Sequence, residues 1–154
     1  LISGYNFCVM KKLILLTVSL FMGLGTIFAG HDRPIKVEQL PEKAQKFLTT
    51  YWTDVKVLKA EMDKDGLEVA YDVYLENKTK IEFDQKGEWK EIKSPMTEIP
   101  KGVIMQNILD YVANNYSGSR IEKIKREHHH YEVELINDIE LKFNKKGEFK
   151  RIDY

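Results

Sequence analysis

The 154-residue chain carries 24 basic and 24 acidic side chains, so its formal charge is zero at pH 7. The charges are mixed along the chain, which argues against nucleic-acid binding, because that binding rests on clustered Lys and Arg side chains that neutralise phosphates. Cys8 is the only cysteine, so no intramolecular disulfide can form and the hydrophobic core alone must stabilise the fold.

Residues 1–30 have the pattern of a secretory signal peptide. A basic start at Met10-Lys11-Lys12 precedes an apolar run from Leu13 to Phe28, and the small residues Ala29 and Gly30 follow. We predict initiation at Met10, with residues 1–9 upstream of the true start, and cleavage near Ala29 or Gly30. The mature protein is then periplasmic or secreted, with no membrane span. An uncleaved membrane anchor is the alternative, although a bilayer crossing needs roughly 20 apolar residues.

Residues 31–94 are predicted to form one helix followed by four strands. Pro41 suits the first position of a helix, and apolar residues recur at helical spacing from there to Tyr51. Residues 55–62 read as the first strand. Residues 67–75 alternate between apolar and polar, as in an antiparallel strand with one wet face. The alternation continues to Phe83, and a turn ending at Gly87 leads into a last strand.

Residues 95–154 repeat this pattern. The segment Phe83 to Ile92 recurs 60 positions later, without a gap, as Phe143 to Ile152. Tyr71 to Leu75 matches Tyr131 to Leu135 at the same offset. Pro100 opens a second helical pattern. We infer an internal duplication, with both units packed into one compact domain.

The predicted fold class is α+β. Two tandem helix-plus-four-strand units form two layers, with both helices on one face of an antiparallel sheet. The other face of the sheet is open to solvent or to a partner. The sequence leaves open whether the two units join edge to edge and whether the chain oligomerises.

Tandem units that end in Phe-Asp-x-x-Gly-x-Trp-x-x-Ile, in an exported chain, resemble the PepSY-like proteins of Bacteroidetes. Asp84, Gly87 and Trp89 fit this motif, whereas Asn144 and Phe149 depart from it in the second unit. The resemblance covers nearly all of the predicted mature chain. It implies a two-layer fold like that of the β-lactamase-inhibitor protein and no established enzymatic activity. Related PepSY domains occur beside peptidases, which they are regarded as restraining. The family offers no site motif to carry over.

Candidate binding residues lie on the predicted open face. Successive side chains of a strand point to opposite faces, so the neighbours of the inward-pointing Val133 and Leu135 point outward. By this alternation the open face carries Asp72, Tyr74, His128, His130, Glu132 and Glu134. Tyr74 is the candidate anchor, because tyrosine contributes strongly at interfaces.

No metal or cofactor is predicted. His128 and His130, with carboxylates nearby, could hold zinc or copper, but a structural zinc site needs four convergent ligands and no second cluster supplies them. The segment Asp63-Lys64-Asp65-Gly66 partly fits the spacing of a calcium loop. Its flanks read as strands rather than helices, so we predict a turn.

These features predict an exported, non-catalytic binding module that contacts another exported protein or peptide through the open face. Inhibition or regulation of an exported hydrolase or peptidase is one form of this role. The predicted mature chain has neither a cysteine nucleophile nor a Gly-x-Ser-x-Gly motif, so we predict that it is not an enzyme. The alternatives are a periplasmic zinc or copper sensor built on His128 and His130, and an envelope structural protein.

Overall fold

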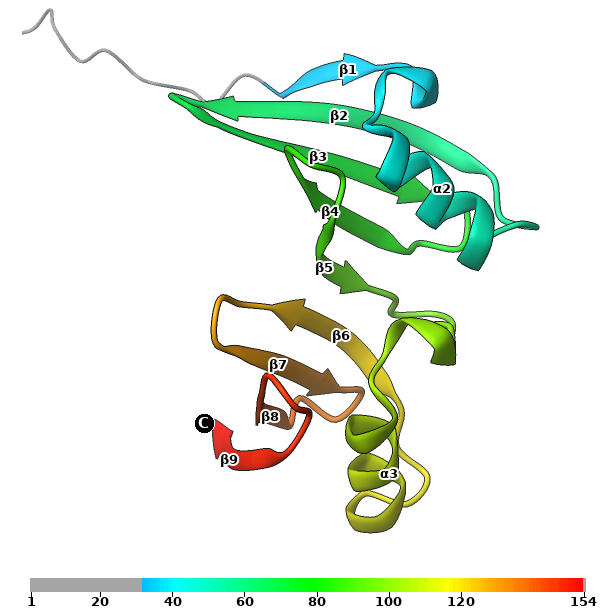
Figure 1. The fold of residues 1–154 in the computed structure, drawn as a ribbon. Coiled ribbons are helices and arrows are strands. Elements are labelled where there is room, and N and C mark those ends of the chain that lie inside the picture. The colour runs from blue at the N-terminus through cyan, green and yellow to red at the C-terminus, as the bar shows by residue number, and fades with distance from the viewer. Residues whose placement is uncertain (1–31, 154) are drawn as a thin grey trace, which may run out of the picture.

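The computed structural model describes residues 32–153 (Figure 1). The predicted signal peptide lies outside the described residues. In chain order the elements are β1 (Arg33–Ile35), the 3₁₀ helix η1 (Val37–Gln39), α2 (Glu42–Tyr51), β2 (Val57–Asp65), β3 (Glu68–Leu75), β4 (Lys80–Asp84), β5 (Trp89–Lys93), the 3₁₀ helix η2 (Lys101–Val103), α3 (Gln106–Asn115), β6 (Ile121–Arg126), β7 (His130–Leu135), β8 (Glu140–Asn144) and β9 (Phe149–Asp153).

The nine strands within residues 32–153 form one antiparallel sheet in the order β1 to β9, so each strand pairs with its neighbours in sequence. Helix α2 lies beside the first strands and α3 beside the last ones (Figure 1). The buried sides of both helices belong to one core cluster with the sheet. The predicted α+β class, with two layers and both helices on one face, is confirmed. The prediction missed β1 and both 3₁₀ helices.

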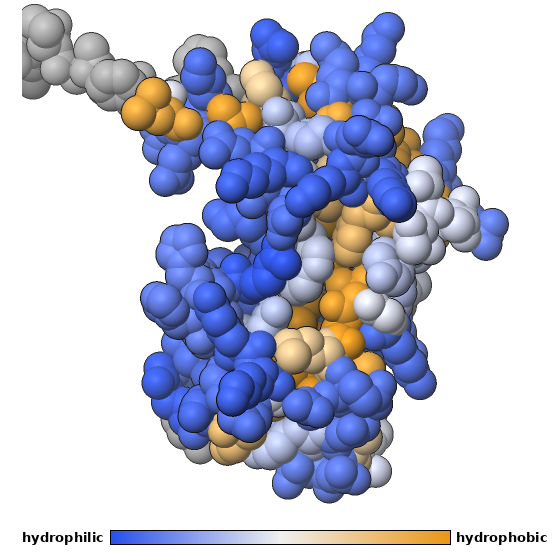
Figure 2. Space-filling model, viewed as in Figure 1, coloured by the Kyte–Doolittle hydropathy of each residue, from blue (hydrophilic) through white to orange (hydrophobic). Residues whose placement is uncertain are grey.

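The core lies between the helices and one face of the sheet. The helix side chains buried there are Ala44, Leu48, Ile108 and Val112. The large sheet side chains buried beneath them are Val73, Leu75, Ile81, Phe83, Ile92, Ile124, Val133, Leu135, Leu141 and Phe143. One aromatic ring of each helix packs edge-on against the sheet, as Phe47 on Phe83 and Tyr111 on Phe143. In the view of Figure 1, hydrophilic residues cover most of the surface, and a narrow hydrophobic band runs through the middle from the first half toward the second (Figure 2).

Strands β5 and β6 join the two halves. Ile92 of β5 stands opposite Ile124 of β6, and the two side chains are 0% and 1% exposed. Glu91 pairs with Lys125 on the other face of the same two strands. Because this ladder is continuous with those on either side, the two halves share a single sheet and a single core.

The linker that follows β5 is fixed by buried polar contacts. The fully buried hydroxyl of Ser94 lies 2.9 Å from Thr79 Oγ1 and donates to the carbonyl oxygen of Thr97 at 2.8 Å. The guanidinium of Arg120 donates to the carbonyl oxygens of Ser94 and Pro95. The linker therefore packs against both halves, as its short length predicts.

Strand pairing repeats between the halves. Tyr71 stands opposite Phe83 in β3–β4, and Tyr131 stands opposite Phe143 in β7–β8. The duplication itself remains our inference from these matched positions.

The β4–β5 and β8–β9 turns are built alike. Asp84 Oδ1 accepts two backbone N–H groups in the first turn, and Asn144 Oδ1 accepts two in the second. Gly87 and Gly147 then adopt φ values of 77° and 76°, a region that favours glycine. Asparagine thus replaces aspartate without loss of the turn, because the two backbone N–H groups need only a side-chain oxygen as acceptor.

The prediction that Pro100 opens the second helix is wrong. Pro100 precedes η2, and α3 begins only at Gln106. Between them Ile104 and Met105 are extended, with ψ near 138° and 137°, and Ile104 is buried. Burial of this side chain requires a break in the helical pattern that the apolar spacing did not reveal.

Gly87→Ala is expected to lower the free energy of unfolding by about 2–4 kcal/mol. A Cβ here would lie 2.8 Å from Pro41 Cβ and 2.9 Å from the backbone nitrogen of Ala44, in addition to the strain of a positive φ. Gly66→Ala is the matched control, since Gly66 has φ 59° and no atom within 4 Å of such a Cβ, so it should cost only about 1–2 kcal/mol. Chemical denaturation measures both, and equal losses would contradict the packing of α2 on this turn.

Candidate functional site

The face of the sheet opposite the helices, here called the open face, is covered by two rows of side chains that run across the strands. Directly opposed residues of antiparallel strands point to the same face, so the pairing register defines each row. The first row, from β2 to β9, contains Glu61, Asp72, Glu82, Glu91, Lys125, Glu132, Lys142 and Arg151. The second row contains Lys59, Tyr74, Lys80, Lys93, Lys123, Glu134, Glu140 and Asp153.

The two rows carry opposite charges on β2 to β5 and, with the signs exchanged, on β8 and β9. On β6 both row residues are basic, and on β7 both are acidic. From β2 to β5 the first row is acidic and the second is basic apart from Tyr74. On β8 and β9 the first row is basic and the second is acidic. Ion pairs connect the rows, for example Lys80 to Asp72 at 2.7 Å and Lys142 to Asp153 at 2.6 Å. Each exposed pair adds little stability on its own.

Tyr74 is the aromatic residue within these rows. The ammonium groups of Lys59 and Lys80 lie 5.4 and 5.5 Å from the centre of its ring, within cation–π range. Its hydroxyl lies 3.5 Å from Asp72 Oδ2. Partial burial, followed by the neighbouring Asp72 carboxylate, raises the pKa of Tyr74. The phenol therefore stays protonated at neutral pH and remains able to donate a hydrogen bond.

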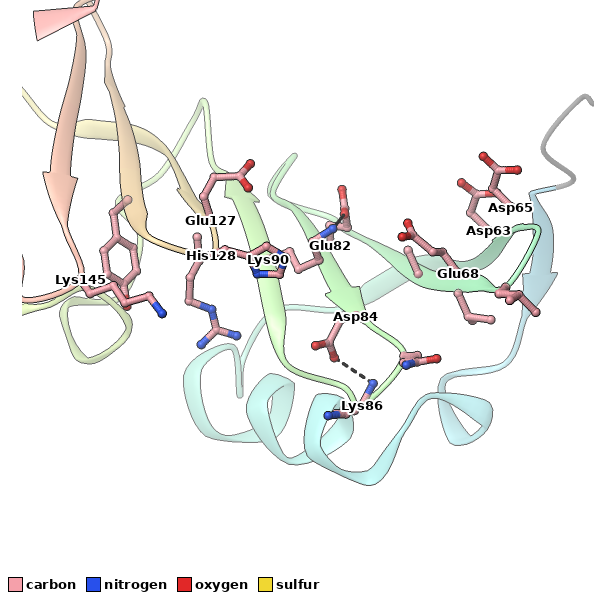
Figure 3. A pocket seen from close by; sticks show the side chains of 16 residues that line it. Asp63, Asp65, Glu68, Glu82, Asp84, Lys86, Lys90, Glu127, His128 and Lys145 are labelled. Carbon is pink, nitrogen blue, oxygen red and sulfur yellow. Dashed lines mark hydrogen bonds and ion pairs between the residues drawn. The ribbon is translucent and has the colours of Figure 1, made fainter.

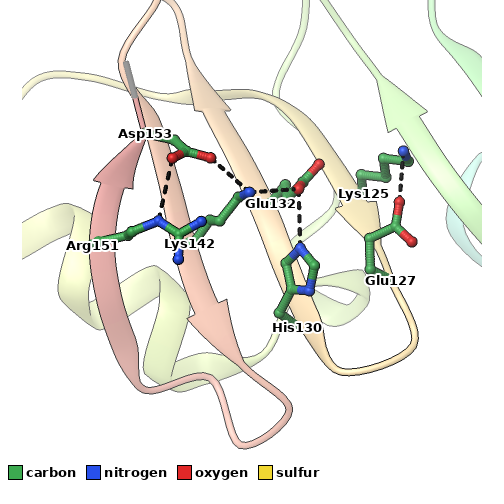
Figure 4. Close-up of polar contacts among 7 residues, drawn as sticks. All are labelled: Lys125, Glu127, His130, Glu132, Lys142, Arg151 and Asp153. Atoms are coloured by element: carbon green, nitrogen blue, oxygen red, sulfur yellow. Dashed lines mark hydrogen bonds and ion pairs between the residues drawn. The ribbon is translucent and has the colours of Figure 1, made fainter.

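The second half of the open face holds a chain of ion pairs (Figure 4). Glu132 Oε1 lies 3.0 Å from His130 Nε2 and 3.1 Å from Lys142 Nζ. Asp153 links Lys142 to Arg151, at 2.6 and 3.2 Å. The hydrogen bond from His130, and then that from Lys142, lower the pKa of Glu132. This carboxylate is therefore charged at neutral pH and is held in one position by two donors.

The structure brings most of the predicted site residues onto one face. The residues that lie there are Asp72, Tyr74, His130, Glu132 and Glu134. Glu134 Oε2 accepts a hydrogen bond from Lys123 Nζ at 3.3 Å. Their role in binding remains a prediction.

The predicted placement of His128 beside His130 on one strand is wrong. Strand β6 ends at Arg126 and β7 begins at His130, so His128 is exposed in the turn between them. The two imidazoles are thus not presented by one strand. Within residues 32–153 no group of three or more His, Cys, Asp or Glu side chains is placed to hold a metal ion.

A pocket of about 880 Å³ lies where the β2–β3, β4–β5, β6–β7 and β8–β9 turns gather (Figure 3). The first half contributes the acidic side chains Asp63, Asp65, Glu68, Glu82 and Asp84. The first half also contributes Lys86 and Lys90, and the second half contributes Arg126, Glu127, His128 and Lys145. The Oδ1 atom of Asp63 is buried here without a hydrogen-bond partner. The sequence analysis treated residues 63–66 only as a turn and missed the pocket. The pocket forms only when the sheet brings turns of both halves together at one end, which the local sequence does not show.

Comparisons with known proteins agree with this architecture. Residues 69–151 match a family model described as "Putative beta-lactamase-inhibitor-like, PepSY-like". A Bacteroides thetaiotaomicron structure, described as a "putative calcium-regulated periplasmic protein", is 41% identical with a TM-score of 0.77; the match covers 80% of this chain and 97% of that one. A Bacteroides vulgatus structure, described as a "putative periplasmic protein from DUF2874 family", is 41% identical with a TM-score of 0.76; that match covers 82% of this chain and 99% of the other. No curated protein matches the chain.

No helix within residues 32–153 is long and apolar enough to cross a membrane.

Glu132→Gln is expected to flatten the acid side of the stability–pH curve. The folded-state pKa of Glu132 lies below its ordinary value of 4.5, so its contribution is complete above that value and is lost as pH falls through the folded pKa. The variant should therefore melt lower than the parent at neutral pH, and the two should converge in acid. Glu140→Gln is the control, since Glu140 makes no ion pair in the described part of the chain. A difference that persists unchanged into acid would contradict the assignment.

Proposed function

Because the chain belongs to the PepSY-like, β-lactamase-inhibitor-like family, we propose that it is an exported binding module without catalytic activity. It contacts another exported protein or peptide through the open face of its sheet. Regulation of an exported hydrolase or peptidase is the form of this role that the inhibitor-like description favours.

The observation that carries this proposal is the position of Tyr74 between two lysines in a face of ordered charge. A half-buried tyrosine supplies contact area at low entropic cost, and such residues dominate the energetics of interfaces. Lys59 and Lys80 hold the ring from both sides, so little conformational freedom remains to be lost on binding. The preorganised ring of Tyr74 is therefore the proposed centre of the contact with the partner.

The charge rows restrict which partner fits. A partner that lies across β2 to β5 has to place basic groups over the first row and acidic groups over the second, and the reverse applies over β8 and β9. Like charges placed opposite each other cost several kcal/mol at an interface, so this pattern rejects partners with other arrangements. Electrostatic complementarity of this kind also raises the association rate and makes it depend on salt.

A non-catalytic role agrees with the environment of Ser94, in the linker that follows β5. Ser94 is fully buried and its hydroxyl is engaged by Thr79 and Thr97, neither of which is a base. Catalysis by a hydroxyl nucleophile requires an exposed oxygen with a general base in contact. The inhibitor-like family description fits the same conclusion.

The proposed location is the periplasm. Two similar structures are described as periplasmic proteins, and residues 1–30 have the sequence of a signal peptide. Export through this segment would leave the binding module free of its leader.

Metals have no part in the proposal. One similar protein is described as calcium-regulated, and the histidine run raised zinc or copper as an alternative. In the described part of the chain the carboxylates and imidazoles do not converge on one point.

Affinity capture from an envelope extract tests the proposal, with the processed protein as bait and mass spectrometry as the readout. We expect a specific exported protein, such as a hydrolase, to be retained. The double variant Tyr74→Ala/His130→Ala should no longer retain this protein, because the substitutions remove two side chains from the open face. Recovery should also fall as salt rises, since the face is charged.

Gln106→Ala/Asp110→Ala is the matched control, because this hydrogen-bonded pair lies exposed on α3, on the opposite side of the molecule. It should capture the same protein as the parent. Undiminished capture by the Tyr74/His130 variant would refute the face assignment. An eluate equal to that of an unrelated bait would favour the envelope structural alternative.

A further inference from the structure

The two edges of the sheet differ in their readiness to pair with another strand. β1 is three residues long and contains Pro34, which has no N–H to donate. β9 is five residues long, from Phe149 to Asp153, and contains no proline. Within residues 32–153 β9 pairs only with β8, so one of its sides is open. The β1 edge is therefore short and interrupted by proline, whereas the longer β9 edge keeps all of its backbone N–H groups.

The first half shows what a strand beside β9 would look like. β5 occupies the position of β9, since Ile92 stands opposite Ile81 just as Ile152 stands opposite Leu141. β5 has β6 on its outer side, and there Ile124 covers Ile92 completely. Ile152 has no such neighbour and remains partly exposed. The missing element is an antiparallel strand with an apolar residue opposite Ile152.

The backbone of β9 is oriented to accept such a strand. The N–H of Ser94 donates to the carbonyl oxygen of Glu122 on β6 at 2.7 Å. Backbone groups of alternate residues point to the same side of a strand, so Ile92 also presents its N–H and C=O toward β6. By the matched register, Ile152 presents its N–H and C=O to the open side of β9.

The sequence around Ile152 is complementary to itself. In an antiparallel pair of two β9 strands centred on Ile152, Arg151 of each copy stands opposite Asp153 of the other. The two isoleucines meet on the helix-side face. Arg151 and Asp153 lie on the open face, where they already pair within one chain at 3.2 Å. A register centred on Arg151 would instead oppose two like charges.

We propose that two copies of this chain pair through their β9 strands, antiparallel and centred on Ile152. The sheet then runs through both copies, the helices of both lie on the same side, and the two open faces become one surface. The pairing involves short strands, so the dimer is weak and its formation depends on concentration. The inference is independent of the proposed partner binding.

Sedimentation equilibrium over a wide concentration range tests this. The chain is expressed with residues 1–154 and purified in the processed form that the cell yields. We expect a reversible monomer–dimer equilibrium. Arg151→Asp should raise the dissociation constant about tenfold or more, because two attractive pairs become two repulsive ones. The double swap Arg151→Asp/Asp153→Arg should restore dimerisation, and this recovery excludes simple misfolding.

Two further variants separate backbone pairing from charge. Ile152→Pro should abolish the dimer while leaving the β8–β9 ladder, because the N–H that it removes points outward. Arg33→Asp makes the same charge change on the β1 edge and should have no effect. A chain that stays monomeric at every concentration overturns the proposal. So does a dimer that survives both Arg151→Asp and Ile152→Pro.

Discussion

The packing of Ile92 against Ile124 is the interaction on which the rest of the structure depends. It joins β5 to β6 and so makes one sheet of two halves, each with its own helix. Without this pair the halves would expose two apolar edges, and each would be too small to bury much of its surface alone. Because β5 and β6 pair in a regular antiparallel ladder, the pairing register continues from one half to the other. The charged rows of the two halves are therefore continuous across the sheet.

Alternation in the sequence was sufficient to predict the two layers and the outward direction of Asp72, Tyr74, Glu132 and Glu134. Period-two patterning fixes the face of a strand residue once its neighbours, such as Val73 and Val133, are known to be buried. It cannot fix where a strand begins, so His128 was placed on β7 although it lies in the preceding turn. The rows across the sheet were also beyond prediction, since each depends on the register of every strand pair between β2 and β9.

The open face combines features that each contribute only modestly to stability. The charges of the two rows are nevertheless ordered, with one arrangement of signs on β2 to β5 and the reverse arrangement on β8 and β9. Burial raises the pKa of Tyr74, and hydrogen bonds lower that of Glu132, so both groups hold defined protonation states at neutral pH. A face with fixed charges and one held aromatic ring is suited to selective contact with a charged partner, as the binding-module proposal requires.

Carboxylate footprinting of the protein, free and bound to its captured partner, shows whether the open face is the surface that contacts the partner. Covalent labelling of Asp and Glu side chains, read by mass spectrometry, reports which carboxylates a partner covers. The account predicts protection of Asp72, Glu132 and Glu134, from both halves of the open face, and unchanged labelling of Glu42 and Asp110 on the helices. Protection of the helix carboxylates, with the open face labelled as in the free protein, would contradict it.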